Sequence, residues 1–106
     1  MFFVAETEHG IAGYIILFKR KNCNFLRIYS IAVDPALRGM HIGRDLLTHA
    51  EKITKEMNMN ALSLEVHQEN QPAILFYFKH GFAVTQEIPD YYNPGVNAFK
   101  MKKILN

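Results

Sequence analysis

The chain has 106 residues, of which 49% are hydrophobic and 21% charged, with a formal net charge of +2. This composition is typical of one soluble globular domain over residues 1–106 and leaves no room for a second folding unit. The single cysteine, Cys23, excludes an intramolecular disulfide and favours a reducing cytoplasm, the scattered histidines argue against a metal site, and the mild positive charge argues against a nucleic-acid partner.

The longest apolar run covers only residues 14–18, whereas a helix that crosses a membrane needs about 20 apolar residues. The N-terminus also lacks the basic start and the small-residue cleavage site of a signal peptide. We therefore expect neither a membrane segment nor an export signal.

Three strands are predicted in the first third of the chain. Residues 2–5 and 11–18 are apolar and β-rich, and a polar segment that ends in glycine separates them, which favours an antiparallel hairpin. Residues 25–33 alternate apolar positions with Arg27 and Tyr29, which predicts a third strand that ends before an Asp-Pro pair.

Two helices and a strand are predicted in the middle of the chain. Apolar residues recur every three or four positions over residues 42–57, which predicts an amphipathic helix. Residues 62–67 alternate as a buried strand does, so Glu65 projects from the side opposite the leucines. Asn70 is a suitable N-cap for a second helix, which Gly81 ends.

Residues 82–85 and 98–104 are predicted to be closing strands, and the turn-rich residues 89–95 between them an ordered loop. The strand-helix-strand-helix order in the middle requires a parallel strand pair with a right-handed crossover, while the flanking segments add antiparallel pairing. The predicted fold is therefore a mixed α/β sheet.

The segment over residues 33–44 carries the strongest functional signal. It holds two glycines and two arginines directly before the first predicted helix. Such a loop presents unpaired backbone N–H groups and the positive end of the helix dipole, which together bind phosphate or pyrophosphate. Gly39 and Gly43 alone do not make a dinucleotide G-x-G-x-x-G motif, and no Gly-Lys-Ser/Thr of a P-loop follows. The loop is predicted to be an anion cradle of another kind.

This loop resembles the pyrophosphate loop of the GNAT superfamily of acetyl-CoA-dependent N-acetyltransferases, Arg/Gln-x-x-Gly-x-Gly/Ala, with Arg38, His41 and Gly43 at its three defined positions. His41 stands where the family usually has glycine. If this position needs a positive φ, the histidine costs about 1 kcal/mol. The run from residue 64 to residue 82 is similar to the family's L-E-V-x-x-x-N-x-x-A-x-x-L-Y-x-x-x-G-F, with Phe76 in place of leucine.

The C-terminal part, Tyr91-Tyr92 and then residues 97–101, is similar to the Y-Y…D-A-x-x-M tail of the subgroup that acetylates protein N-termini, including the ribosomal-protein-alanine acetyltransferase, with Asn97 in place of aspartate. The resemblance implies a mostly antiparallel sheet with a central parallel strand pair and two helices, shortened at its N-terminus. We expect either that a partner subunit, such as a second copy in a homodimer, covers the sheet edge left open, or that the chain is a truncated member with weak turnover.

The resemblance also implies an activity and its residues. Acetyl passes directly from acetyl-CoA to a primary amine, with Glu65 as general base and Tyr77 as general acid. The acceptor enters past Tyr91 and Tyr92. The residues implied to contact acetyl-CoA are Ile31, Ala32 and Val33 for the acetyl and pantetheine arm, Arg38, Gly39, Met40, His41, Ile42, Gly43 and Arg44 for the pyrophosphate, and Asn70 as a further contact.

At pH 7 about one α-amino group in ten is neutral, against a few in ten thousand lysine side chains, so a carboxylate base suits a protein or peptide N-terminus best. Two other functions stay open, namely acetylation of a small amine such as a polyamine or antibiotic, and acyl-CoA binding without catalysis. Other assignments also stay open: Glu69, Glu87 or an ordered water as base, core packing for Tyr77, and the cofactor's 3′-phosphate or plain solvation for Lys100, Lys102 and Lys103.

Overall fold

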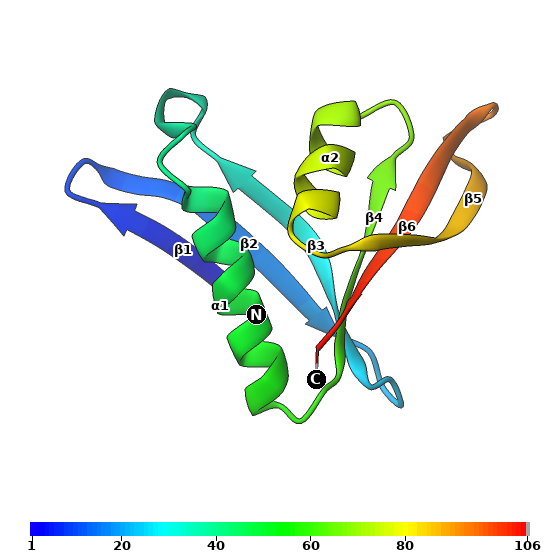
Figure 1. Ribbon diagram of the computed structural model, residues 1–106, viewed down its shortest axis with the longest axis horizontal. Helices are drawn as coiled ribbons and strands as arrows, with labels where there is room; N and C mark the ends of the chain where they lie inside the picture. Colours follow the sequence, from blue (N-terminus) through cyan, green and yellow to red (C-terminus); the bar gives the residue numbers. More distant parts are fainter. Residues whose placement is uncertain (106) are drawn as a thin grey trace.

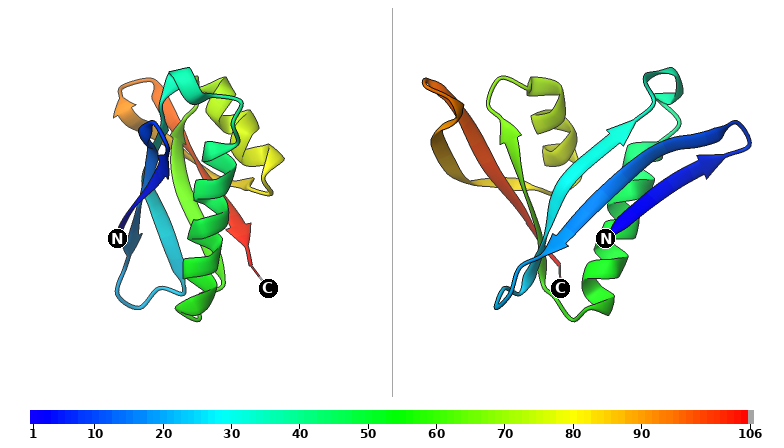
Figure 2. Two further views of the ribbon diagram at one scale, coloured as in Figure 1. Left: turned by 90° about the vertical axis from the view of Figure 1, so that its left-hand side faces the viewer. Right: turned by 180° about the vertical axis from the view of Figure 1, so that it is seen from behind.

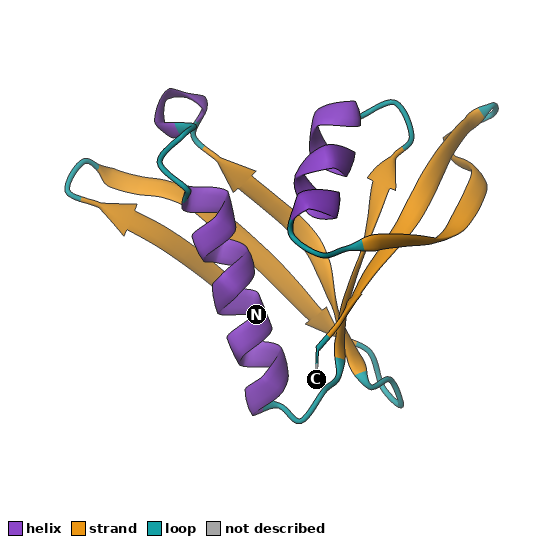
Figure 3. Cartoon of the chain, viewed as in Figure 1, coloured by secondary structure: helices purple, strands orange, loops and turns teal. Residues whose placement is uncertain are grey.

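The computed structural model describes residues 1–105, with the side chain of Tyr92 outside that description. Its elements follow one another along the chain as six strands, two α-helices and one 3-10 turn (Figures 1 and 3). Their bounds are β1 (Phe2–Thr7), β2 (Gly10–Lys19), β3 (Phe25–Val33), η1 (Pro35–Leu37), α1 (Ile42–Glu56), β4 (Ala61–His67), α2 (Gln71–Lys79), β5 (Ala83–Asn93) and β6 (Val96–Ile104).

The six strands form one sheet in the order β1-β2-β3-β4-β6-β5. Every neighbouring pair is antiparallel except β3 and β4, which run parallel and are joined by α1. The mixed sheet with one central parallel pair is thus confirmed. The parallel ladder is short: it joins Phe25–Arg27 to Ala61–Ser63, and beyond it the two strands diverge (Figure 1).

Both helices lie on the same face of the sheet, as the edge-on view in Figure 2 shows. The core is formed there, because the inward positions of the strands meet the apolar stripe of α1 and the underside of α2. Its fully buried side chains include Ile15, Leu17, Leu26, Leu62 and Met101 on the strands, Phe82 after α2, and Leu47 and Ala50 on α1.

Neither helix of the described chain covers the opposite face of the sheet (Figure 2). Aromatic side chains gather there in two pairs: the ring centroids of Phe18 and Tyr29 lie 4.7 Å apart, and those of Phe2 and Tyr14 lie 5.7 Å apart. This uncovered face also carries Glu65, since the strand alternation that buries its neighbours turns its side chain away from the helices.

Gly13 on β2 sits where β2, β3 and the start of α1 meet. A Cβ atom at this position would lie 2.6 Å from the backbone oxygen of Ala32 and 3.3 Å from the side chains of both Ile42 and Leu46. The absence of a side chain therefore lets the first turn of α1 pack closely on the sheet.

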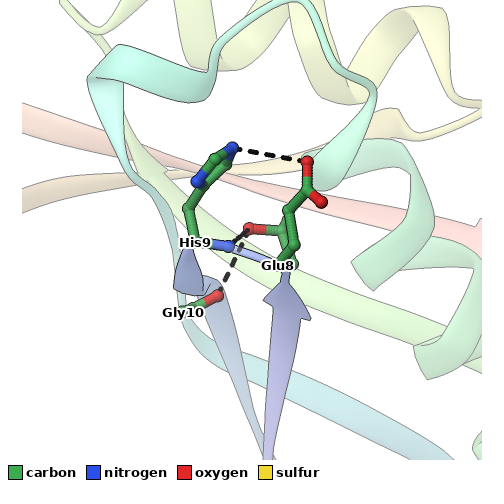
Figure 4. A network of polar contacts seen from close by, with 4 residues as sticks. Glu8, His9 and Gly10 are labelled. Carbon is green, nitrogen blue, oxygen red and sulfur yellow. Dashed lines mark hydrogen bonds and ion pairs between the residues drawn. The ribbon is translucent and has the colours of Figure 1, made fainter.

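The turn between β1 and β2 is held by its own polar groups (Figure 4). The backbone N–H of His9 donates to Oγ1 of Thr7 at 3.1 Å, and Gly10 takes a φ of 105°, which glycine adopts without strain. The side chains of Glu8 and His9, 3.5 Å apart and almost fully exposed, add little to stability. The hairpin predicted for residues 2–18 is present.

One prediction, the loop over residues 89–95, is wrong for most of its length. β5 continues to Asn93, and only a two-residue turn separates it from β6. The ladder with β6 shifts register between Ile88 and Asn93, and Asp90 has a φ of 53° within this irregular stretch. A bulged edge strand tolerates proline and left-handed residues, so turn-forming residues did not end the strand here.

Candidate active site

Near its end, the loop between β3 and α1 has two residues with a positive φ. Gly39 has a φ of 90° and His41 a φ of 61°, and α1 begins at the next residue, Ile42. The first bond of the helix is from the N–H of Asp45 to the carbonyl of His41, at 3.0 Å. The N–H groups of residues 42–44 precede that bond and have no acceptor inside the helix, so they are the donors to which the anion-cradle prediction refers, and the cradle stays a prediction.

His41 meets the condition under which a histidine is unfavourable, since its position requires a positive φ. Its side chain makes no capping hydrogen bond to α1 and is exposed. Histidine tolerates this region better than most residues, and the cost is about 1 kcal/mol. The backbone N–H groups are nevertheless presented as they would be with glycine.

Gly43 keeps the start of α1 close to α2. A Cβ atom on Gly43 would lie 3.0 Å from Cζ of Phe76, so any larger residue would press on the aromatic ring. The surroundings are positively charged: burial, and after it the charges of Lys79, Lys103 and Arg44, lower the pKa of His80 at the end of α2. A polyanion is favoured at the junction of the two helices.

Beyond the short parallel ladder, the end of β3 has a strand partner on one side. Its residues Ile31 and Val33 pair with Ile15 and Gly13 of β2. On the β4 side, the backbone groups of this part of β3 face the opening between the diverging strands (Figure 1). A strand edge without a β4 partner, followed after a short loop by a helix N-terminus, offers amide donors for a pantetheine arm and for a pyrophosphate, so these residues fit acetyl-CoA.

Glu65 projects from β4 two residues past its last pairing with β3. Its Oε2 accepts a hydrogen bond from Nε of Arg27 at 2.6 Å, and only 14% and 20% of the two side chains are exposed. Nη2 of the same arginine donates to the hydroxyl of Tyr91 at 3.3 Å. The carboxylate is therefore held by a charge-assisted bond in a partly desolvated place.

Arg27 was not predicted as a site residue. The alternation of β3 had placed it on the side opposite the apolar positions, which is the side that Glu65 takes on β4. That shared face was the available signal, but the lateral alignment of the two strands was needed to bring the residues together.

Tyr77 lies on α2 with only 9% of its surface exposed. Its ring contacts those of Phe76 and Phe82, at centroid distances of 5.4 and 5.7 Å, within the core. Burial raises the pKa of Tyr77 to about 12. Tyr77 thus lies in the core on the helix-covered face of the sheet, whereas Glu65 projects from the opposite face.

The remaining sequence candidates have these places. Asn70 caps α2, since its Oδ1 accepts the N–H of Ala73 at 3.3 Å. Tyr91 accepts a hydrogen bond from Arg27, which also binds Glu65, and the side chain of Tyr92 is outside the described residues. The alternative bases and cations are accounted for as follows: Glu69 is exposed, Glu87 accepts from Asn97 at 2.8 Å, Lys100 and Lys102 lie over the ring of Phe25, and Lys103 pairs with Glu51 at 3.0 Å.

Comparison with known proteins decides the family. The model of the Acetyltransferase (GNAT) family matches residues 1–82, which is more than half of the chain. The chain belongs to this family. The fold, with its loop before α1 and its diverging parallel strands, is accordingly a GNAT fold.

Among related proteins, an N-alpha-acetyltransferase of Sulfurisphaera tokodaii is 36% identical over 94% of this chain and 66% of its own length. A spermidine N(1)-acetyltransferase of Thermoplasma acidophilum is 34% identical over 79% of this chain and 51% of its own length. An acetyltransferase of Bacillus anthracis, solved in complex with acetyl coenzyme A, superposes with a TM-score of 0.92 at 30% identity, over 99% of this chain and 62% of the other. This GNAT chain spans 65% and 66% of the first relatives it matches.

In residues 1–105, neither helix has the length and apolar character needed to cross a membrane. The same stretch holds no group of three or more His, Cys, Asp or Glu side chains placed to bind a metal ion.

Tyr77 makes the stability of this GNAT domain depend on alkaline pH. The phenol of an unfolded chain titrates near pH 10, whereas burial raises the folded-state pKa to about 12. Below pH 10 both states are protonated and the full stability is present; from pH 10 to 12 the unfolded chain loses its proton first, so stability falls by about 2 to 3 kcal/mol. Urea unfolding at pH 8.5 and 11 should show about half of this fall, about 1.4 kcal/mol, in the wild type and much less in Tyr77→Phe. An equal fall in both proteins would contradict it.

Proposed function

We propose that this GNAT member transfers acetyl from acetyl-CoA to a primary amine, and that the amine is the N-terminus of a protein or peptide. The observation that carries the proposal is the placement of two features where β3 and β4 diverge: the start of α1, whose first N–H groups have no acceptor inside the helix, on one side, and the Glu65 carboxylate on the other.

Acetyl-CoA is held in this proposal mainly by backbone groups. The N–H groups at Ile42, Gly43 and Arg44 bind the pyrophosphate, with the loop from Arg38 to His41 around it, and the open edge of β3 over residues 31–33 binds the acetyl and pantetheine arm. Asn70 is a further contact by family resemblance, in addition to its role as the cap of α2.

Bound acetyl-CoA supplies a thioester carbonyl that a neutral amine can attack directly. Glu65 acts as general base: its carboxylate accepts the proton that the acceptor ammonium must lose before its lone pair can form the new C–N bond. The C–S bond then breaks, and the departing thiolate takes up the second proton, which the newly acetylated nitrogen loses. Tyr77, the expected general acid, is protonated at neutral pH because its pKa is about 12. A thiol of ordinary pKa, about 8.5, is a stronger acid than this phenol, so Tyr77 assists by donating a hydrogen bond to the departing sulfur and keeps its own proton.

The α-amino group is favoured because it loses its proton much more readily than a lysine side chain, with a reference pKa near 8 against 10.4. A carboxylate is a weak base, so an acceptor that loses its proton easily is acetylated faster. Tyr91, beside Arg27 and Glu65, contacts the incoming peptide in this proposal, and Tyr92 follows it in the sequence. The N-alpha-acetyltransferase of Sulfurisphaera tokodaii supports this choice by similarity.

A small amine is the second candidate, and the similarity to a spermidine N(1)-acetyltransferase favours it. The homodimer and the cytoplasmic location expected from the sequence stay predictions. Light scattering checks the first of them.

The proposed function is tested with three acceptors offered at equal concentration. They are a lysine-free peptide that begins with alanine, a lysine peptide whose N-terminus is blocked, and spermidine. Release of free thiol from acetyl-CoA gives the rate, and mass spectrometry gives the modified nitrogen. We expect kcat/KM for the free N-terminus to exceed that for the lysine peptide by at least about tenfold, in line with the neutral fractions of the two amines.

Modification of the lysine peptide alone would overturn the N-terminal acceptor, and a preference for spermidine would favour the small-amine function. Calorimetric binding of acetyl-CoA without turnover on any amine would indicate a binding module and overturn the activity.

A further inference from the structure

Arg27 contacts two residues of the acceptor side at once. Nε donates to Oε2 of Glu65 on β4, and Nη2 donates to the hydroxyl of Tyr91 on β5. From these contacts we infer that Arg27 is a positioning residue, which fixes the Glu65 carboxylate and the Tyr91 hydroxyl in one arrangement toward the acceptor amine. The inference rests on the proposed function, because it assigns Arg27 a part in the work of Glu65.

The position of Arg27 in the sheet suits this role. It is the last residue of β3 that pairs with β4, opposite Ser63, and Glu65 follows two residues later, where the strands have begun to diverge. The arginine side chain therefore bridges β3 and β4 just beyond the last pair of their ladder. Its guanidinium carbon also lies 5.9 Å from the ring centroid of Tyr29, which limits its movement away from the sheet.

A guanidinium has the geometry for two partners. It is planar and rigid, with donors on different edges, so it orients both acceptors relative to each other. With Oε2 engaged by Arg27, Oε1 is the carboxylate oxygen that serves the acceptor ammonium. A rotating carboxylate would lose part of this alignment, and catalysis depends steeply on such alignment.

Lys100 is the other cation placed by the sheet near Glu65, since the two residues are directly paired between β4 and β6. Its ammonium lies 5.4 Å from the ring centroid of Phe25, and the hydrogen bond to Glu65 is made by Arg27. An ammonium group also lacks the planar, rigidly placed donors with which a guanidinium can hold Glu65 and Tyr91 at the same time. The arrangement is therefore specific to the arginine.

The test measures kcat and KM for the peptide and for acetyl-CoA in the full chain, with the variants Arg27→Gln, Arg27→Lys and Tyr91→Phe. We expect Arg27→Gln to lower kcat by about 10- to 100-fold while KM for acetyl-CoA changes less than about twofold. Arg27→Lys should recover part of kcat, since it restores the charge without the fork. Arg20→Gln, an exposed arginine after β2, is the matched control and should keep the wild-type kcat.

The double variants decide whether Arg27 acts through Glu65. In a Glu65→Gln background, Arg27→Gln should change kcat less than about twofold, and Tyr91→Phe should cost less in an Arg27→Gln background than in the wild type. The positioning role alone would be overturned if Arg27→Gln lowered kcat equally in the wild type and in the Glu65→Gln background. It would also be overturned if the loss of kcat disappeared at a temperature where circular dichroism shows Arg27→Gln to be fully folded. A wild type that acetylates no amine would overturn the proposed function and this role with it.

Discussion

Replacing Glu65 by glutamine is expected to lower kcat for peptide acetylation by about 100- to 1000-fold, the usual contribution of a general base. Glutamine has nearly the same shape, and its side-chain oxygen can still accept the hydrogen bond from Nε of Arg27. It cannot take up the proton of the acceptor ammonium. The loss should therefore appear in kcat at pH 7.5, measured as release of free thiol, with little change in unfolding temperature.

Two measurements make this result specific. Glu56→Gln, which changes an exposed carboxylate at the far end of α1, is the matched control and should leave kcat unchanged. The affinity for acetyl-CoA, measured by calorimetry, should be the same in Glu65→Gln as in the wild type, because the proposed function assigns cofactor binding to β3 and the start of α1. Full kcat in Glu65→Gln, or a comparable loss in Glu69→Gln, would show that another group is the base.

Replacing Gly13 by alanine is expected to lower the free energy of unfolding by about 3 kcal/mol, near the upper end for overpacking a core. The new Cβ would lie 2.6 Å from the backbone oxygen of Ala32, and the hydrogen-bonded ladder between β2 and β3 fixes that oxygen. The side chains of Ile42 and Leu46 block an outward shift, since each is 3.3 Å away. Urea unfolding at neutral pH measures the effect.

Gly43→Ala is the contrast for this prediction. Its Cβ would lie 3.0 Å from the edge of the Phe76 ring, which can shift by rotating, so a smaller cost of about 1 kcal/mol is expected. Equal costs for the two variants, or a neutral Gly13→Ala, would show that β2 and β3 adjust more easily than their ladder implies.

The elements with regular periodicity could be predicted from the sequence. The α1 stripe and the alternation in β4 depend only on local spacing, so the helix start and the outward direction of Glu65 followed from neighbouring residues. The glycine-containing loop before α1 could be placed likewise, and its role as an anion cradle stays a prediction. The glycine that the family usually has at the position of His41 indicated a positive φ there, and His41 has a φ of 61°.

Features that depend on lateral alignment could not be predicted. Arg27 and Glu65 are 38 residues apart in sequence, and their contact depends on the register of a parallel pair that local periodicity does not define. The length of β5 was missed for a related reason. Pro89 and Asp90 are turn formers in isolation, but pairing with β6 holds them in a bulged strand.

The short parallel ladder has a mechanical consequence. The backbone ladder between β3 and β4, which has three residue pairs, is the strand pairing that joins the β1-β2-β3 half of the described sheet to the β4-β6-β5 half. The two halves are otherwise connected by side chains: the shared core and the hydrogen bonds of Arg27 to Glu65 and Tyr91. A ligand that binds both the edge of β3 and the half of the sheet that contains β4 connects the two halves. Its binding therefore increases the free energy of unfolding of the whole domain.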